Sequence, residues 1–138
     1  MSLTFSSKGY ELTDDPDRVD FDVVASLLNP TYWAATRSRE QIIESCRNSA
    51  CFSLFFESAQ VGMFRALSDR GAYTYLMDFV VAPEHQRKGI GSWALQCILG
   101  YPPFRGTRFI LLTMDAQEFY RKFGFDTHPY ECMIRRED

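Results

Sequence analysis

Hydrophobic and polar residues alternate or recur at helical spacing over the first third of the chain, and these patterns predict a strand followed by two helices. The alternation over residues 3–12 is typical of a half-buried strand. Apolar residues at helical spacing within residues 15–29 predict a first helix, which an Asn-Pro pair ends. Ser38 and Gln41 form a capping-box pattern, which predicts the start of a second helix.

The middle of the chain is rich in aromatic and branched residues and is interrupted by two polar turns. Residues 50–58, 59–69 and 73–82 therefore predict three consecutive antiparallel strands. A helix is expected over residues 91–100, because its apolar residues are close to helical spacing and two prolines follow it. The short, almost wholly apolar stretch 107–114 is typical of a strand buried in a parallel pairing.

The last quarter of the chain predicts one more helix and one more strand. Asp115 and Glu118 form a capping-type pair before residues 116–125, where Gly124 is expected to end the helix. The alternating residues 130–136 predict the last strand. The resulting order is β-α-α-β-β-β-α-β-α-β. It predicts an α/β fold in the broad sense that includes α+β folds, in which helices connect strands by crossovers in the second half only.

Composition limits the number of domains and the classes of partner. The chain has 138 residues, 46% of them hydrophobic, so residues 1–138 are expected to form a single domain. The net charge of -3, from 15 Lys+Arg and 18 Asp+Glu, argues against nucleic acid as a partner. No apolar run reaches the ~18 residues of a membrane span and no signal-peptide pattern begins the chain. We therefore expect an intracellular, cytoplasmic protein without a membrane partner.

The four cysteines are widely spaced and contain no C-x-x-C pair: Cys46, Cys51, Cys97 and Cys132. This spacing indicates neither a zinc site nor a thioredoxin-type motif, and we predict no metal site. All four thiols are expected to be reduced and buried. Cys97 is interpreted as a small core residue rather than a nucleophile.

A glycine-containing turn joins the third strand of the meander to the next helix. Gly89 and Gly91 formally match the dinucleotide-binding pattern G-x-G-x-x-A. We reject that interpretation because PEHQRK separates the strand from the first glycine, the preceding strands form hairpins, and no acidic residue follows about 20 positions on. A glycine bend at a helix N-terminus favours an anion, and Arg87 and Lys88 add positive charge. The turn suits a pyrophosphate; the alternative is that its glycines serve the turn geometry alone.

The sequence QRKGIG at residues 86–91 resembles the [Q/R]-x-x-G-x-[G/A] signature of the GCN5-related N-acetyltransferases, the GNAT superfamily. A second segment, DAQEFYRKFGF at residues 115–125, resembles that family's later block, in which a helix carries F-Y-x-K-x-G-F. The resemblance covers roughly residues 50–136, and the earlier part in its order of elements alone. It implies a mixed, V-shaped, largely antiparallel sheet flanked by helices, whose splayed central strands admit the pantetheine arm of acetyl-CoA.

The resemblance also implies roles for individual residues. The backbone of Phe79, Val80 and Val81 would bond to pantetheine, and Tyr120 matches the tyrosine that donates a proton to the departing CoA thiolate. The turn and the first helical residues would hold the pyrophosphate: Gln86, Arg87, Lys88, Gly89, Ile90, Gly91 and Ser92. Asp115 stands where many relatives have asparagine. Two roles therefore stay open for it, a side-chain contact with pantetheine and a plain N-cap of the following helix.

Asp78 is the candidate general base, because it precedes Phe79 on the same strand and the attacking amine must be neutral. The alternative is an aspartate that only bonds to a neighbouring turn. His85 and His128 are interpreted as turn and loop residues without a catalytic role.

Tyr32, Trp33, Arg37 and Arg39 lie in the segment that in relatives helps to wall the acceptor pocket. An aromatic wall suits a cationic or ring-bearing amine, although anchoring the helix junction is an equally good role for Tyr32 and Trp33. The resemblance implies direct transfer of an acetyl group from acetyl-CoA, as co-substrate, to a primary amine of a small molecule or peptide. The alternative is a noncatalytic acyl-CoA-binding sensor or interaction module. The oligomeric state stays open, with a homodimer among the compatible states.

Overall fold

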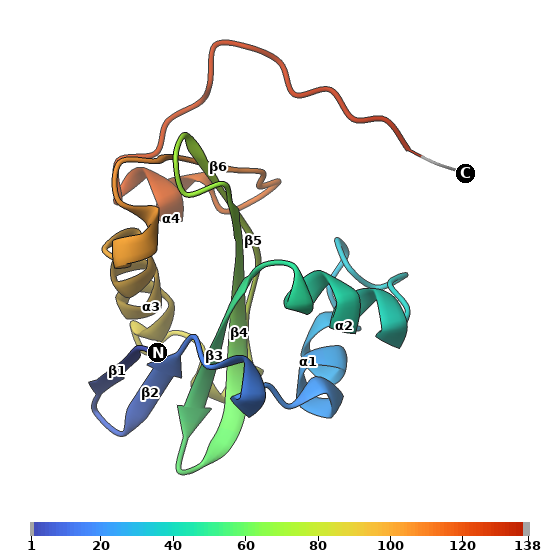
Figure 1. The fold of residues 1–138 in the computed structure, drawn as a ribbon, viewed down its shortest axis with the longest axis vertical. Helices are drawn as coiled ribbons and strands as arrows, with labels where there is room; N and C mark the ends of the chain where they lie inside the picture. The colour runs from blue at the N-terminus through green and yellow to red at the C-terminus, as the bar shows by residue number, and fades with distance from the viewer. Residues whose placement is uncertain (1, 137–138) are drawn as a thin grey trace.

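The computed structural model describes residues 2–136 and contains one six-stranded sheet (Figure 1). Its strands follow each other in space in their order along the chain, β1-β2-β3-β4-β5-β6. The strands are β1 (Thr4–Ser7), β2 (Tyr10–Thr13), β3 (Ala50–Phe56), β4 (Ala59–Ser68), β5 (Tyr73–Val81) and β6 (Arg108–Leu111). Neighbouring strands are antiparallel except β5 and β6, which run parallel. The sheet is therefore mixed and largely antiparallel, as expected.

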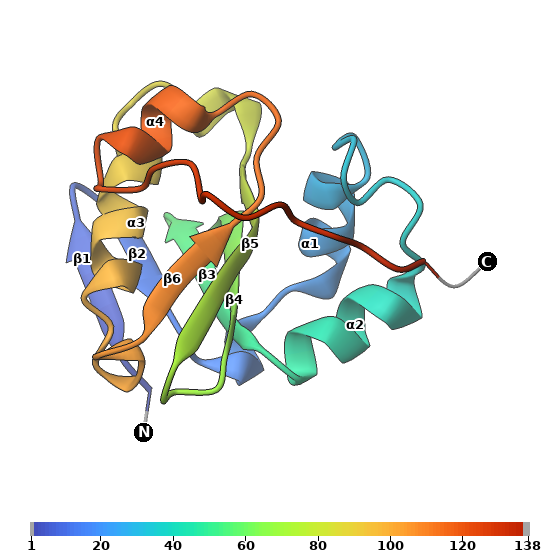
Figure 2. The ribbon, with the colours of Figure 1, turned by 90° about the horizontal axis from the view of Figure 1, so that it is seen from above.

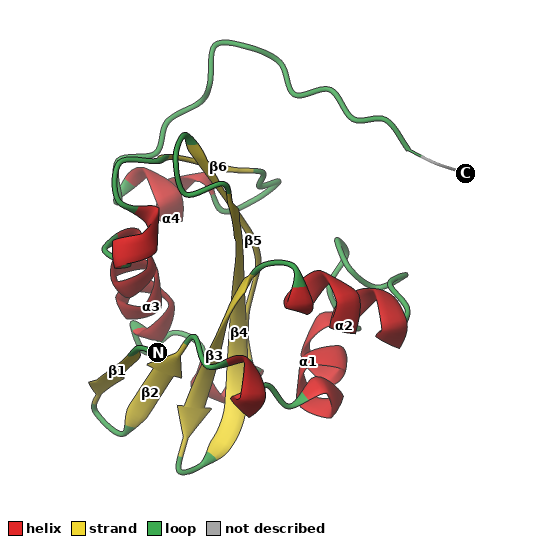
Figure 3. Cartoon of the chain, viewed as in Figure 1, coloured by secondary structure: helices red, strands yellow, loops and turns green. Residues whose placement is uncertain are grey.

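Helices cover both faces of this sheet, so that the molecule has three layers (Figures 1 and 3). The helices are α1 (Phe21–Leu28), α2 (Arg39–Arg47), α3 (Ile90–Leu99) and α4 (Gln117–Arg121). The first two lie against one face, and α3 and α4 lie against the other. None of the helices in the described part of the chain is long and apolar enough to cross a membrane.

Strand alternation divides the core into two clusters, one on each face of the sheet. Phe64 is buried on the α3 side together with Phe52, Leu95 and Ile98. Its neighbour Met63 points to the other face and packs with the α1–α2 cluster. Successive residues of a strand point to opposite faces, so this one strand serves both hydrophobic layers.

Most of the predicted elements are confirmed. Ser38 accepts a hydrogen bond from the Gln41 amide at 3.1 Å while the Ser38 amide donates to Gln41 Oε1 at 2.8 Å, which is the reciprocal capping box. The three-stranded meander and the parallel strand after α3 are present. The first predicted strand is in fact a hairpin, because Lys8 and Gly9 both take left-handed backbone conformations and turn the chain between β1 and β2.

Two predictions about the C-terminal part are wrong. Asp115 does not cap α4; the N-cap is Ala116, which has no side-chain cap, and its amide donates to Thr113 Oγ1 at 3.0 Å. Residues 130–136 form no strand; they have no regular structure, and although they overlap β6 and β5 in Figure 2, they stand off the body of the molecule in Figure 1. A strand exists only where a neighbour pairs with it, and the alternation of this segment cannot supply one.

The cysteines follow the expectation in part. All four are free thiols, and Cys46 and Cys51 are buried. Cys97 is half-buried and burial raises the pKa of its thiol, as fits a core residue rather than a thiolate nucleophile. Cys132, on the extended C-terminal segment, is exposed, so the prediction that all four are buried is wrong for this one.

Candidate active site

The parallel strands β5 and β6 separate partway along their length. Their pairing runs from Tyr73 with Arg108 to Leu76 with Leu111. Among the residues that the structure describes, β5 then continues to Val81 without a partner on that side. A cleft of about 730 Å³ lies beside this separation. It is lined by β5 from Tyr75 to Phe79, by residues 111–116, and by Tyr32, Trp33, Arg37, Tyr120 and Ile134. The splayed strands expected from the sequence therefore form a cavity.

A β-bulge interrupts β5 at the wall of this cleft. Met63 pairs with Val80 and Arg65 pairs with Met77, so Phe64 alone stands opposite both Asp78 and Phe79. Asp78 takes a left-handed conformation with φ of 54°, one that Asp tolerates better than most side chains. A bulge leaves one residue out of the ladder and bends the strand, which directs the backbone after it away from its neighbour.

The Asp78 side chain is buried against two arginines. Its Oδ2 lies 2.7 Å from Arg37 Nη1 and 2.8 Å from Arg65 Nε, with 1% of the aspartate side chain exposed. Oδ1 is also buried, and no hydrogen-bond partner for it lies among the described residues. Both ion pairs hold the Asp78 carboxylate in a fixed position. This arrangement is compatible with the structural alternative for Asp78, with arginines in place of a turn.

The glycine turn presents free backbone amides at the N-terminus of α3. Gly89 is the N-cap and takes a left-handed conformation with φ of 78°, which glycine adopts without strain. The first helical amide that donates to a carbonyl in this region is that of Trp93, to Gly89 O at 3.1 Å. The amides of Ile90, Gly91 and Ser92 precede it and have no intrahelical partner. Together with the helix dipole, they form a site suited to an anion.

Other predicted residues of the turn have defined contacts. The Gln86 Nε2 donates to the carbonyl oxygen of Val81 at 2.8 Å, which ties the turn to the end of β5. Arg87 takes a left-handed conformation with φ of 61°, and both Arg87 and Lys88 are exposed. His85 is half-buried rather than fully exposed, and its Nδ1 lies 2.7 Å from the Tyr10 hydroxyl.

Tyr120 projects from α4 into the same cleft. Its ring centroid lies 6.4 Å from that of Phe79 and 5.8 Å from that of Phe125. Burial raises the pKa of the Tyr120 phenol, and the nearby Tyr32 adds to the shift. This shift keeps the phenol in its protonated form at neutral pH. Its neighbour Phe119 packs against the core, as expected.

The loop between α1 and α2 forms the opposite wall. Tyr32 and Trp33 contact each other edge to face, with ring centroids 5.0 Å apart, and both line the cleft. Arg37 also lines it. Arg39 is not among the residues that line the cleft; its Nη1 forms a surface ion pair with Asp22 Oδ1 at 2.7 Å.

The sequence analysis missed Arg65 and the bulge. A signal for Arg65 was present, because a lone charge within the apolar stretch VGMFRALS requires a buried partner. The bulge has no comparable signal, since an Asp inside an apolar strand is compatible with a regular ladder. Within residues 2–136, no group of three or more His, Cys, Asp or Glu side chains is placed to hold a metal ion.

The mixed sheet, whose strands separate beside a helix capped by glycine, has the fold of solved acetyltransferase structures. A Xanthomonas campestris pv. campestris protein described as an acetyltransferase of the GNAT family superposes with a TM-score of 0.89 at 26% identity, covering 96% of each chain. The Neisseria gonorrhoeae N-acetylglutamate synthase, solved with coenzyme A and N-acetyl-glutamate, shares the fold with a TM-score of 0.72 at 18% identity, over 89% of this chain and 30% of that one.

Sequence comparison leads to the same class. A Gibberella zeae protein named as an acetyltransferase, FG08082, is 28% identical over 137 aligned residues, covering 82% of this chain and 76% of the relative. The sequence profile of the Acetyltransferase (GNAT) family matches residues 21–125. The chain belongs to this family of N-acetyltransferases, which use acetyl-CoA as co-substrate.

Proposed function

We propose that the protein transfers the acetyl group of acetyl-CoA directly to a primary amine of a small molecule or an exposed peptide. The observation that carries this proposal is the position of the Tyr120 phenol, which lines the cleft between the separated strands. A protein that only binds acyl-CoA has no need of a proton donor at that point. Acetyl-CoA supplies an activated thioester whose departing thiolate needs a proton.

The residues around the cleft fit this co-substrate. The end of β5, from Phe79 to Val81, lacks a strand partner on the β6 side and offers backbone groups to an extended ligand. The unpaired amides at the start of α3 offer hydrogen bonds and a positive dipole end to a pyrophosphate. Arg87 and Lys88 are exposed beside these amides and add charge of the required sign. We assign the CoA site to these two segments and Gln86.

The acceptor is assigned to the other end of the cleft. Tyr32 and Trp33 offer ring faces and edges to an amine-bearing ligand, and their attraction for a cation is electrostatic. Asp78 and its two arginines fix the bulge behind this wall, so we treat Asp78 as a positioning residue. The amine must lose a proton before it attacks, and bulk water or an ordered water is our candidate for the acceptor of that proton.

A turnover assay across a panel of primary amines tests the proposal. Release of free CoA thiol that depends on both acetyl-CoA and one class of amine is the expected result. Binding of acetyl-CoA without turnover on small amines or N-terminal peptides would favour the noncatalytic alternative. Acetyl-CoA should also raise the melting temperature by mass action, more than ATP or NAD does.

A further inference from the structure

Two arginines and one carboxylate form a charge cluster at the wall of the cleft, and the cluster carries an unbalanced positive charge. Arg37 and Arg65 both bond to Oδ2 of Asp78, at 2.7 Å and 2.8 Å. In the described part of the chain, no other carboxylate lies within ion-pair distance of either arginine. Two positive charges against one negative charge leave an excess of one positive charge.

The excess charge meets the cleft at Arg37. The side chain of Arg65 is 8% exposed and that of Asp78 is 1% exposed, whereas 26% of the Arg37 side chain is exposed. Arg37 lines the cleft together with Tyr32 and Trp33, and Arg65 does not line it. A ligand in the cleft can therefore contact the Arg37 guanidinium directly.

The Arg37 side chain has hydrogen-bond donors that the protein does not use. A guanidinium group carries five N–H donors in a fixed, planar arrangement. Within residues 2–136, the one hydrogen bond of this side chain runs from its Nη1 to Asp78 Oδ2. Its Nε and Nη2 have no partner in that part of the chain. A partly buried cation with unused donors favours an oxyanion, because its charge is partly desolvated and not fully compensated.

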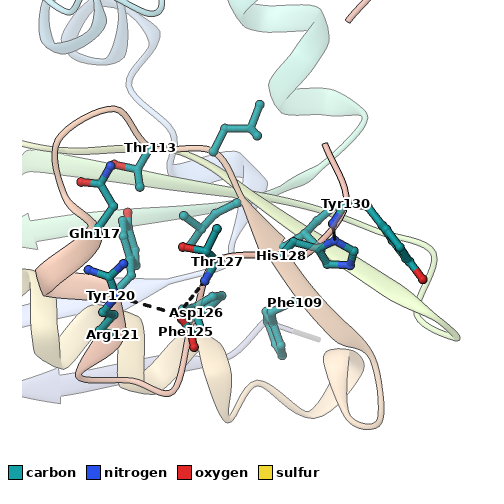
Figure 4. A pocket seen from close by; sticks show the side chains of 13 residues that line it. Phe109, Thr113, Gln117, Tyr120, Arg121, Phe125, Asp126, Thr127, His128 and Tyr130 are labelled. Carbon is teal, nitrogen blue, oxygen red and sulfur yellow. Dashed lines mark hydrogen bonds and ion pairs between the residues drawn. The ribbon is translucent and has the colours of Figure 1, made fainter. Parts of the chain in front are cut away.

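The groove next to the cleft lacks such an excess. This groove has a volume of about 360 Å³, adjoins the cleft at Thr113 and Tyr120, and is drawn in Figure 4. The arginine in its lining, Arg121, has Nη1 at 3.0 Å from Glu118 Oε1 and Nε at 3.9 Å from Asp126 Oδ1. Two carboxylates therefore compensate the positive charge there, and the groove has no comparable affinity for an anion.

The rest of the cleft lining complements a cation and an apolar body. Asp115 is exposed in this lining, and no ion pair joins it to Arg37 or to another cation that the structure describes. Tyr32, Trp33 and Tyr75 add aromatic surface to the same cleft. The cleft therefore presents a cation, a separate carboxylate and aromatic rings to one ligand, as suits a molecule with groups of both charges.

We propose that the acceptor is a small amine that also carries one carboxylate, and that Arg37 binds this carboxylate and so determines specificity. The inference rests on the proposed acetyl transfer and names the class of its acceptor. The charge count selects a carboxylate, which brings one negative charge, over a phosphate group, which brings about 1.5 to 2. Nε and Nη2 of Arg37 donate to the two carboxylate oxygens in the bidentate geometry that guanidinium favours. A plain amine would leave this cation without a counter-ion.

Binding of reaction products tests this specificity without requiring turnover. The probes are matched pairs, each an N-acetyl amino acid and the N-acetyl amine that lacks only its carboxylate: N-acetylphenylalanine with N-acetylphenethylamine, N-acetyltryptophan with N-acetyltryptamine, and N-acetylleucine with N-acetylisopentylamine. Calorimetry on the full chain, with and without saturating CoA, should give at least a roughly tenfold lower Kd for the carboxylate member of one or more pairs. Equal affinities within every pair, or no measurable binding of any carboxylate member, would overturn the proposal.

Arginine variants assign the preference to one side chain. Arg37→Gln removes the charge and should bring the two members of a pair to near-equal affinity, by weakening the carboxylate member alone. Asp78 keeps Arg65 in this variant, and the melting temperature records whether the fold persists. Arg37→Lys keeps the charge without the bidentate geometry and should retain part of the preference. Arg39→Gln, which loses a surface ion pair with Asp22, is the matched control and should behave as the wild type. A preference that survives Arg37→Gln unchanged would contradict the proposal.

Turnover separates this inference from the function on which it rests. Release of CoA thiol that is faster with phenylalanine, tryptophan or leucine than with the matched plain amine supports both. No release with any amine would count against acetyl transfer, while the product pairs would still decide the carboxylate preference. Acetylation of the plain amines in preference to every amino acid would uphold acetyl transfer and overturn the role of Arg37.

Discussion

Asp78 and Arg65 face each other across the bulge between β4 and β5, with Arg65 Nε 2.8 Å from Asp78 Oδ2. Both side chains are almost completely buried, and Arg37 reaches the same oxygen from the loop before α2. The ion pairs therefore join the two sides of the cleft wall. Buried ion pairs contribute little to stability as a whole, but they become costly when one member is removed.

Asp78→Asn should destabilise the fold strongly, because two arginines would lose their counter-ion in a buried site. We expect the free energy of unfolding to fall by about 3 kcal/mol, measured by urea denaturation. The matched control is Asp22→Asn, which removes an exposed partner of Arg39 and should cost less than about 1 kcal/mol. Unchanged stability with abolished turnover would instead restore Asp78 as the general base.

Gly91→Val should weaken acetyl-CoA binding and leave the fold largely intact. A Cβ at Gly91 would meet Phe119 Cζ at 3.9 Å, an ordinary contact, but a branched side chain beside the free amides would block close approach of a pyrophosphate. We expect at least a roughly tenfold loss of affinity by calorimetry, or about 1.4 kcal/mol. Gly71→Val, in a turn where a Cβ meets nothing within 4 Å, is the control and should bind normally. Equal affinities would place the phosphate site elsewhere.

Tyr120→Phe should affect turnover more than binding. It keeps the ring and its contacts with Phe79, so acetyl-CoA affinity should stay within a few-fold while kcat falls by roughly 10²-fold. The raised pKa of this phenol keeps the proton in place below pH ~10, so the wild-type rate should show no alkaline loss from this group in that range. A hydroxyl with a purely structural role would cost about 1 kcal/mol of stability instead and leave kcat almost unchanged.

Tyr101 should make the fold sensitive to high pH. Burial and a hydrogen bond from its hydroxyl to Asp14 Oδ2 raise the pKa of Tyr101 to about 12. Because this folded-state pKa exceeds the ordinary value of about 10, the stabilisation is complete below pH ~10 and is lost as the pH rises toward 12. Urea midpoints at pH 9 and pH 11.5 should therefore differ more in the wild type than in Tyr101→Phe. An equal alkaline loss in both proteins would exclude this phenol as the cause.

The sequence predicted local structure well where a few neighbouring residues decide it. The Ser38–Gln41 capping box, the meander and the glycine turn each depend on short-range chemistry that the residues themselves display. Partnerships across the fold were not predictable in the same way. Alternation in residues 130–136 describes a strand but cannot say whether a partner is available.

The same limit applies to the candidate site. Asp78 was correctly placed on the strand that lines the cleft, yet its arginine partners lie 13 and 41 positions away and determine what the carboxylate can do. Phe79 and Tyr120 could be associated through the family resemblance, and their rings do approach each other in the structure. The bulge at Asp78 and Phe79 depends on how β4 and β5 fit together, which no local pattern encodes.

The two tryptophans of the chain lie in different parts of the molecule, and this placement gives the protein a natural optical readout. Trp33 lies in the wall assigned to the acceptor, and Trp93 lies in the first turn of α3 beside the free amides. Indole emission responds to the polarity around each ring, so a Trp33→Phe variant should report CoA alone and a Trp93→Phe variant should report the amine. Unknown acceptors could then be screened by fluorescence titration in the absence of any chemical reaction.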